Sequence, residues 1–117
     1  MATSLRIGAR TEGSDIAILS LTGEVEVANA TQVRDAALKL VSGGAKHLVV
    51  DLSGVEYMDS TGLGTLVGLH KRLRESGGQV VIAGAQPRVK RIFDITGLTQ
   101  VFRMHEDVSA ALKEVRG

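Results

Sequence analysis

The sequence predicts an α/β fold, with a mixed β-sheet of four to five strands packed against about four α-helices. Two apolar strand patterns joined by turn residues open the chain, and they predict an N-terminal hairpin. After them, short β-branched runs alternate with amphipathic helical patterns, which is typical of a mostly parallel sheet centre. Because 117 residues can bury one core without disulfides, we expect a single domain over residues 1–117.

The N-terminal hairpin is expected over residues 4–21. Apolar and polar side chains alternate over residues 4–10, as in a strand with one buried face. The Glu-Gly-Ser-Asp of residues 12–15 supplies turn chemistry, and a second strand follows from Ile16 to Leu21. We expect the Thr-Gly-Glu of residues 22–24 to break this second strand.

The rest of the chain alternates helices and strands that end at turn residues. The first helix begins near Asn29, where Asn29 or Thr31 is a plausible N-cap, and the Ser-Gly-Gly of residues 42–44 closes it. The next elements are expected as a strand at 48–52, a helix at 63–75, a strand at 79–83, a helix from Pro87 to Gly97, a short strand edge at 101–102 and a last helix at 106–115.

The junction between the central strand and the next helix carries three consecutive hydrogen-bond acceptors. Asp59, Ser60 or Thr61 can each be the N-cap of that helix, a role worth about 1 kcal/mol. Gly62 and Gly64 follow, although glycine costs a helix roughly 1 kcal/mol relative to alanine. We interpret these glycines as making room for a partner's backbone or for an anion at the helix N-terminus.

Composition argues against several classes of function. Cysteine is absent, and 14 basic residues face 13 acidic ones without a basic cluster interleaved with aromatics, so direct nucleic-acid binding is not expected. The N-terminus lacks the apolar core of a signal peptide, and no apolar run is long enough to span a bilayer. We therefore expect a soluble cytoplasmic protein that does not contact a membrane.

Enzyme chemistry and metal binding are also not expected. The three histidines lie on separate elements without ligand spacing, so the sequence predicts no metal site and no cofactor. Ser60 is not in a nucleophile elbow, because Met58 stands where that motif has its first glycine. Asp51 follows an apolar strand as a phospho-acceptor does, but the acidic pair of receiver domains is missing, so we interpret Asp51 as capping the turn at residues 53–54.

Five segments, in order along nearly the whole chain, resemble the STAS domain family and specifically its bacterial anti-sigma factor antagonists. They are Leu-Thr-Gly-Glu at 21–24, Met-Asp-Ser-Thr-Gly-Leu-Gly at 58–64, Gly-Gly at 77–78, Val-Lys-Arg-Ile-Phe at 89–93 and Thr-Gly-Leu at 96–98. The resemblance implies that the chain is a single STAS-like domain.

The resemblance implies a switch protein that is not an enzyme. It implies that a serine kinase, which is also an anti-sigma factor, phosphorylates Ser60, and that a metal-dependent serine phosphatase reverses the reaction. Thr61 is a second hydroxyl of lower rank. By the same resemblance, the unmodified protein is expected to be a monomer or weak dimer that binds the kinase and thereby frees a sigma factor. The implied partner-binding residues are Glu24, Glu26, Asn29, Asp59, Ser60, Thr61, Gly62, Leu63 and Gly64.

Two points of the resemblance leave alternatives open. The family often has Asp where this chain has Glu26, so the loop acid is one methylene longer, which affects which kinase is recognised. STAS-like domains also serve as scaffold subunits of stress-signalling complexes or as accessory subunits of lipid transporters.

Overall fold

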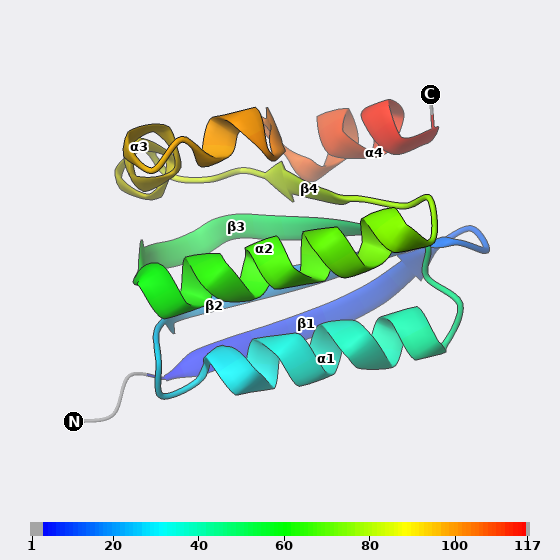
Figure 1. The fold of residues 1–117 in the computed structure, drawn as a ribbon, viewed down its shortest axis with the longest axis horizontal. Helices are drawn as coiled ribbons and strands as arrows, with labels where there is room; N and C mark the ends of the chain where they lie inside the picture. Colours follow the sequence, from blue (N-terminus) through cyan, green and yellow to red (C-terminus); the bar gives the residue numbers. More distant parts are fainter. Residues whose placement is uncertain (1–3, 117) are drawn as a thin grey trace.

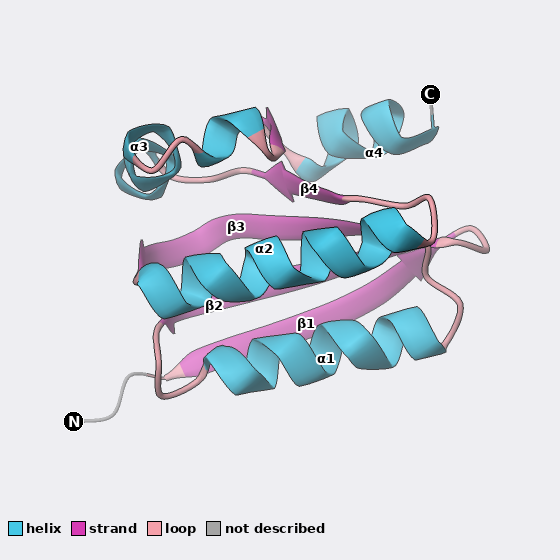
Figure 2. Ribbon diagram, viewed as in Figure 1, coloured by secondary structure: helices cyan, strands magenta, loops and turns pink. Residues whose placement is uncertain are grey.

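The sheet has five strands in residues 4–116, the part of the chain that the computed structural model describes. Residues 1–3 and Gly117 of the expected 1–117 domain lie outside the described residues. The strands, in their order across the sheet, are β1 Leu5–Glu12, β2 Ile16–Val25, β3 His47–Met58, β4 Val80–Ala83 and β5 Arg103–His105 (Figure 2). β1 and β2 pair antiparallel, and the following pairs are parallel. The predicted mixed sheet with an N-terminal hairpin is therefore confirmed.

Four α-helices in the described residues cover the two faces of this sheet. They are α1 Ala30–Ser42, α2 Ser60–Glu75, α3 Pro87–Ile95 and α4 Val108–Arg116, with a 3₁₀ turn at Leu98–Gln100. Helices α1 and α2 lie side by side over one face (Figure 1). Residues of α1, α2 and α3 share the larger apolar core, whereas α4 packs into a smaller core formed by the opposite face.

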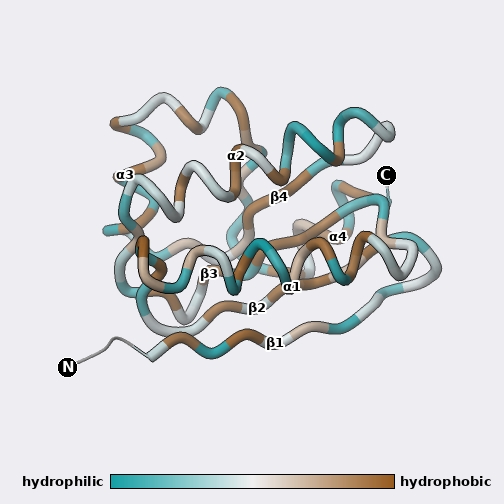
Figure 3. Tube along the Cα trace, turned by 60° about the horizontal axis from the view of Figure 1, so that its bottom comes forward, coloured by the Kyte–Doolittle hydropathy of each residue, from teal (hydrophilic) through white to brown (hydrophobic). Residues whose placement is uncertain are grey.

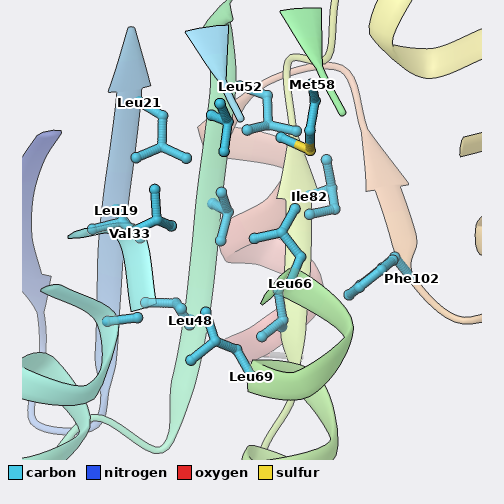
Figure 4. Close-up of a cluster of buried hydrophobic side chains, with 14 of the residues drawn as sticks. Leu19, Leu21, Val33, Leu48, Leu52, Met58, Leu66, Leu69, Ile82 and Phe102 are labelled. Atoms are coloured by element: carbon cyan, nitrogen blue, oxygen red, sulfur yellow. The ribbon is translucent and has the colours of Figure 1, made fainter. Parts of the chain in front are cut away.

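The two cores follow from the alternation of side chains along the strands. In β3, Leu48 and Val50 belong to the larger core, and Val49 between them belongs to the smaller one. Leu66 and Leu69 of α2 meet the strand side chains in the larger core (Figure 4). Burying each such side chain stabilises the fold by about 1.5–3 kcal/mol. A strand covered on both faces therefore needs the continuous apolar run that the sequence shows.

Strand β1 differs because it lies at the edge of the sheet. Leu5 and Ile7 pack against the larger core, whereas Arg6 and Arg10 are exposed. Figure 3 shows this alternation as a change between hydrophobic and hydrophilic colour along β1. The predicted alternating strand is confirmed, and it continues to Glu12.

Strand β2 does not break where the sequence predicts. It continues through residues 22–24 to Val25, with irregular register beside Thr22 and Glu24. Gly23 makes this possible, because its φ of 115° favours glycine and a Cβ there would lie 2.2 Å from the carbonyl oxygen of Ser4. The expectation failed because a bulge absorbs the irregular backbone and the pairing with β3 resumes beyond it.

Strand β3 is also longer than predicted. It extends past residue 52 to Met58, paired with β2 alone among the described strands because β4 stops at Ala83 opposite Asp51. Asp51 therefore lies inside β3, and the expected turn at residues 53–54 is wrong because both residues belong to the strand. The Asp51 Oδ1 still accepts a hydrogen bond from the Ser53 N–H at 3.0 Å. The two extensions bring the β2–α1 loop and the start of α2 to the same end of the sheet.

Near the C-terminus, the expected strand edge at residues 101–102 is wrong. The strand is β5, which begins one residue later at Arg103. Phe102 instead lies 2% exposed in the larger core, with its ring packed edge-on against Phe93 at 5.8 Å. Phe102 of the apolar segment is apolar because it packs in the core, and the more polar residues 103–105 form the strand.

Candidate functional site

Asp59 is the residue that joins the two segments of the candidate site. Its Oδ1 accepts a hydrogen bond from the Gly62 N–H at 2.9 Å, which makes Asp59 the N-cap of α2. Its Oδ2 accepts a hydrogen bond from the Val27 N–H at 3.0 Å, across 32 positions of sequence. One half-buried carboxylate therefore caps α2 and holds the β2–α1 loop against it.

Asn29 closes the β2–α1 loop from inside. Its Oδ1 accepts a hydrogen bond from the Glu26 N–H at 2.9 Å, and its Nδ2 donates to the Glu24 carbonyl oxygen at 2.9 Å. Of the two predicted positions, Asn29 and Thr31, Asn29 is the N-cap residue of α1, although its side chain makes no cap hydrogen bond there. Because Asn29 is 5% exposed, it shapes the loop that carries Glu24 and Glu26.

Ser60 and Thr61 are both exposed at the start of α2. Since Asp59 caps the helix, neither hydroxyl is needed as a cap, and neither donates or accepts a side-chain hydrogen bond within the described residues. The predicted phospho-acceptor is therefore an open hydroxyl next to the free N–H groups of a helix N-terminus.

Gly62 and Gly64 have different roles. A Cβ on Gly62 would lie 2.8 Å from Met58 Cγ and 2.9 Å from Val25 Cγ1, so the absence of a side chain there lets α2 pack closely on the ends of β2 and β3. A Cβ on Gly64 would meet nothing within 4 Å. The interpretation that both glycines make room for a partner is wrong for Gly62, and only Gly64 faces open space.

The implied partner-binding residues thus divide by burial. Asn29, Gly62 and Leu63 are buried, and Leu63 is part of the larger core. The accessible members are Glu24, Glu26 and Asp59, which are partly exposed, and Ser60, Thr61 and Gly64, which are exposed.

Val27 is a surface residue that the sequence analysis missed. It is 70% exposed, in the loop whose backbone Asp59 holds. Tyr57, which precedes the capping segment and pairs with Glu24 across the sheet, is 44% exposed. A valine set between Glu26 and the start of a helix was the available signal, because apolar side chains in a short polar loop have no core to enter.

The described residues contain neither a metal cluster nor a membrane span. No three His, Cys, Asp or Glu side chains within residues 4–116 are placed to hold a metal ion together. None of the helices in that range has both the length and the apolar character that crossing a membrane requires.

His70 lies on the half-buried side of α2. Its Nδ1 accepts a hydrogen bond from the Val80 N–H at 3.1 Å, so the neutral ring carries its proton on Nε2. Burial, together with the nearby Arg74, lowers the pKa of His70 below 6.5. This histidine links α2 to β4 and lies away from the α2 N-terminus.

The fold and the site define a small α/β domain with an exposed hydroxyl at the head of a capped helix. The model of the STAS domain family matches residues 9–111. The chain therefore belongs to the STAS domain family, as its sequence segments indicated.

Known relatives are similar along almost the full chain. The anti-sigma-B factor antagonist of Bacillus subtilis (strain 168) is 35% identical over 107 residues, which cover 92% of this chain and 93% of the relative. The crystal structure of an anti-sigma factor antagonist from Mycobacterium paratuberculosis is similar with a TM-score of 0.88 and 26% identity, covering 97% of this chain and 96% of that one. Bacillus SpoIIAA in its phosphorylated form shares the fold, with a TM-score of 0.75, 19% identity and coverage of 94% and 99%.

Proposed function

We propose that this chain is an anti-sigma factor antagonist. Unphosphorylated, it binds a serine kinase that is also an anti-sigma factor, and the occupied kinase releases its sigma factor. Phosphorylation of Ser60 switches this binding off, and a metal-dependent serine phosphatase restores it. The role needs no cofactor, catalytic residue, membrane or nucleic-acid contact, and it belongs in the cytoplasm. Family membership and the antagonist names of similar proteins support the proposal.

The observation that carries the proposal is the freedom of the Ser60 hydroxyl. It is exposed on the first residue of α2, while the capping bond is made by Asp59. A modification of Ser60 therefore removes no capping interaction from the folded domain. A purely structural serine at this position would itself make the cap.

The folded domain can accept a phosphate at Ser60. A phosphoserine carries about −1.5 to −2 charges at neutral pH. A helix N-terminus favours negative charge through its dipole and its unpaired N–H groups, by about 0.3–1 kcal/mol at an exposed position. Ser60 is exposed, so water screens the repulsion between its phosphate and the carboxylate of Asp59 to about 1 kcal/mol at a separation of about 5 Å. The two terms are of similar size, so we expect the fold to survive phosphorylation.

A partner docked over Ser60 cannot accept the same phosphate. Two like charges about 5 Å apart repel by about 3 kcal/mol at an effective dielectric constant near 20. Such an energy lowers affinity roughly a hundredfold. The switch therefore needs one new charge in the interface and no refolding of the domain.

The accessible residues around Ser60 provide the contacts of the docked state. Val27, whose backbone N–H is bonded to Asp59, is the apolar anchor of this surface, with Glu26 on the same loop and Gly64 one turn along α2. The buried Asn29 and the partly exposed Asp59 fix the loop backbone by hydrogen bonds and so place Val27. This arrangement, an apolar centre with charged neighbours, is common in protein interfaces.

The test is phosphorylation by the serine-kinase anti-sigma factor of the same organism, with Mg²⁺ and ATP. We expect one phosphate on wild-type chain, at Ser60 by mass spectrometry, and none on Ser60→Ala. Thr61→Ala separates the two hydroxyls, because it removes the neighbouring one and should still carry its single phosphate on Ser60. Ser53→Ala is the control, because it removes an exposed hydroxyl outside the implied partner-binding residues. Phosphate at another residue, or none with a kinase that is active on itself or on a second substrate, contradicts the proposal.

A further inference from the structure

An open groove of about 540 Å³ lies between α1 and α2 and begins beside the proposed switch. Thr61, the neighbour of Ser60, lines it at the start of α2, and Arg72 lines it near the other end of that helix. The rise of 1.5 Å per residue places these two positions about 16 Å apart along α2. The groove therefore continues the accessible surface around Ser60 down three turns of the helix.

The α2 wall of the groove lacks side chains at two positions. Gly64 and Gly68 both line it, and a Cβ on either would meet nothing within 4 Å. Internal packing thus does not require glycine at these positions, in contrast to Gly62. Leu38 supplies partly exposed apolar surface in the same groove, and Leu69 lines its floor but is only 3% exposed.

The charged residues that line the groove are all positive. Arg34 of α1 and Arg72 of α2 line it, and its lining includes no acidic residue. No ion pair within residues 4–116 involves Arg72. Arg34 has a 3.7 Å contact with its sequence neighbour Asp35, and both side chains are more than half exposed, so that pair is weak. The groove therefore offers two guanidinium groups without a strong carboxylate partner.

We propose that this groove is a second part of the docking surface, and that it takes an acidic, partly apolar segment of the kinase that Ser60 controls. Carboxylates of that segment pair with Arg34 and with Arg72, and apolar side chains beside them rest on Leu38 and on the bare helix at Gly64 and Gly68. Charge complementarity selects the acid, since guanidinium groups bind carboxylates in a two-point geometry. The inference rests on the proposed function but assigns contacts far from the phosphorylated residue.

The direct test is the dissociation constant of the chain for that kinase, measured by titration calorimetry. Arg72→Glu should weaken binding at least tenfold, because it places a carboxylate against the partner's carboxylate. Arg74→Glu is the matched control: it makes the same charge change in the same last turn of α2, but Arg74 does not line the groove. We expect less than a threefold effect from Arg74→Glu.

A second variant tests the groove through shape and not charge. Gly68→Leu fills the open space, so we expect at least a tenfold loss of affinity. The same substitution should raise the thermal midpoint, since leucine is a better helix former than glycine and meets no clash here. A loss of binding in a more stable protein cannot be attributed to unfolding.

The outcomes separate this inference from the proposed function. If Ser60→Asp abolishes binding while Arg72→Glu and Gly68→Leu bind as wild type does, the groove proposal is overturned and the switch stands. Equal losses for Arg72→Glu and Arg74→Glu mean only a long-range charge effect and also overturn it. If sedimentation shows a wild-type dimer that Arg72→Glu dissociates, the occupant is a second copy and the proposal is wrong. A wild-type chain that binds no kinase overturns both.

Discussion

The inward and outward sides of the first turns of α2 are built for different purposes, although their residues alternate in one short segment. Gly62 and Leu63 face the core, where they allow close packing and fill space. Ser60, Thr61 and Gly64 face solvent, and no packing in the described residues depends on them. Asp59, just before both groups, accepts hydrogen bonds from the Gly62 N–H and from the Val27 N–H of the β2–α1 loop. The comparison teaches that the segment 58–64 is half scaffold and half binding surface.

The largest expected difference between the two sides of α2 comes from truncating one side chain that faces the core and one that faces solvent. Leu63→Ala removes a core side chain that is 5% exposed, so we expect the free energy of unfolding to fall by about 2–4 kcal/mol. Thr61→Ala should change it by less than about 0.5 kcal/mol. Urea titrations of both variants measure these values, and equal losses would contradict the division.

Asp59→Ala should lower the free energy of unfolding by about 2 kcal/mol, because it removes the α2 cap and the bond to the Val27 N–H together. Asp59→Ser is the control, since serine can keep the cap but cannot reach both N–H donors. We expect Asp59→Ser to lose about half as much in the same urea titration. A serine variant as unstable as the alanine variant would mean that the cap is not the main contribution.

Replacing Gly62 and Gly64 by alanine should change the stability of the fold in opposite directions. Gly62→Ala forces a Cβ against Met58 and Val25, so we expect a loss of about 1–2 kcal/mol after the gain in helix propensity. Gly64→Ala should stabilise the chain by up to about 1 kcal/mol, because its Cβ enters open space. The thermal midpoints of the two variants measure these changes. Destabilisation by Gly64→Ala would show that Gly64, like Gly62, is needed for packing.

The smallest expected effect is the contribution of His70, further along the inward side of α2, to the pH dependence of stability. Because the pKa of His70 is lowered in the fold, the unfolded chain binds a proton first as pH falls below about 6.5. His70 therefore contributes stability above that pH, and this contribution declines as pH falls toward its lower folded pKa. His70→Gln, which keeps an acceptor for the Val80 N–H, should show a shallower decline between pH 6.5 and 5.5 than wild type in urea titrations. If the free energy of unfolding falls equally steeply with pH in both proteins, titratable groups other than His70 cause the decline.

The sequence predicted the order of elements well because each element has a local signature. Alternation predicted the edge strand β1, and continuous apolar runs predicted β3 and β4. The ends of β2 and β3 were not predictable in this way, because polar residues and glycine occupy them and pairing between the two strands decides their length. Local pattern therefore gives existence and order of elements but not the length of irregular strands.

The details of the site depended on contacts that are distant in sequence. Three adjacent acceptors had equal local claims to the N-cap, and the bond from the Val27 N–H to Asp59 supports one of them. The difference between Gly62 and Gly64 comes from Met58 and the sequence-distant Val25, whose side chains lie against Gly62 and not against Gly64. The groove arginines carried no motif at all, since Arg34 and Arg72 approach a common space only once α1 lies beside α2.

The central claim is that Ser60 takes a charge without cost to the fold but not while docked. The most direct measurement uses one sample of chain phosphorylated at Ser60 and one without, comparing the free energy of unfolding and the affinity for the kinase on each. We expect the unfolding values to agree within about 1 kcal/mol and the affinity to fall about a hundredfold. A phosphorylated chain that loses several kcal/mol of stability, or that binds as tightly as before, would contradict the account.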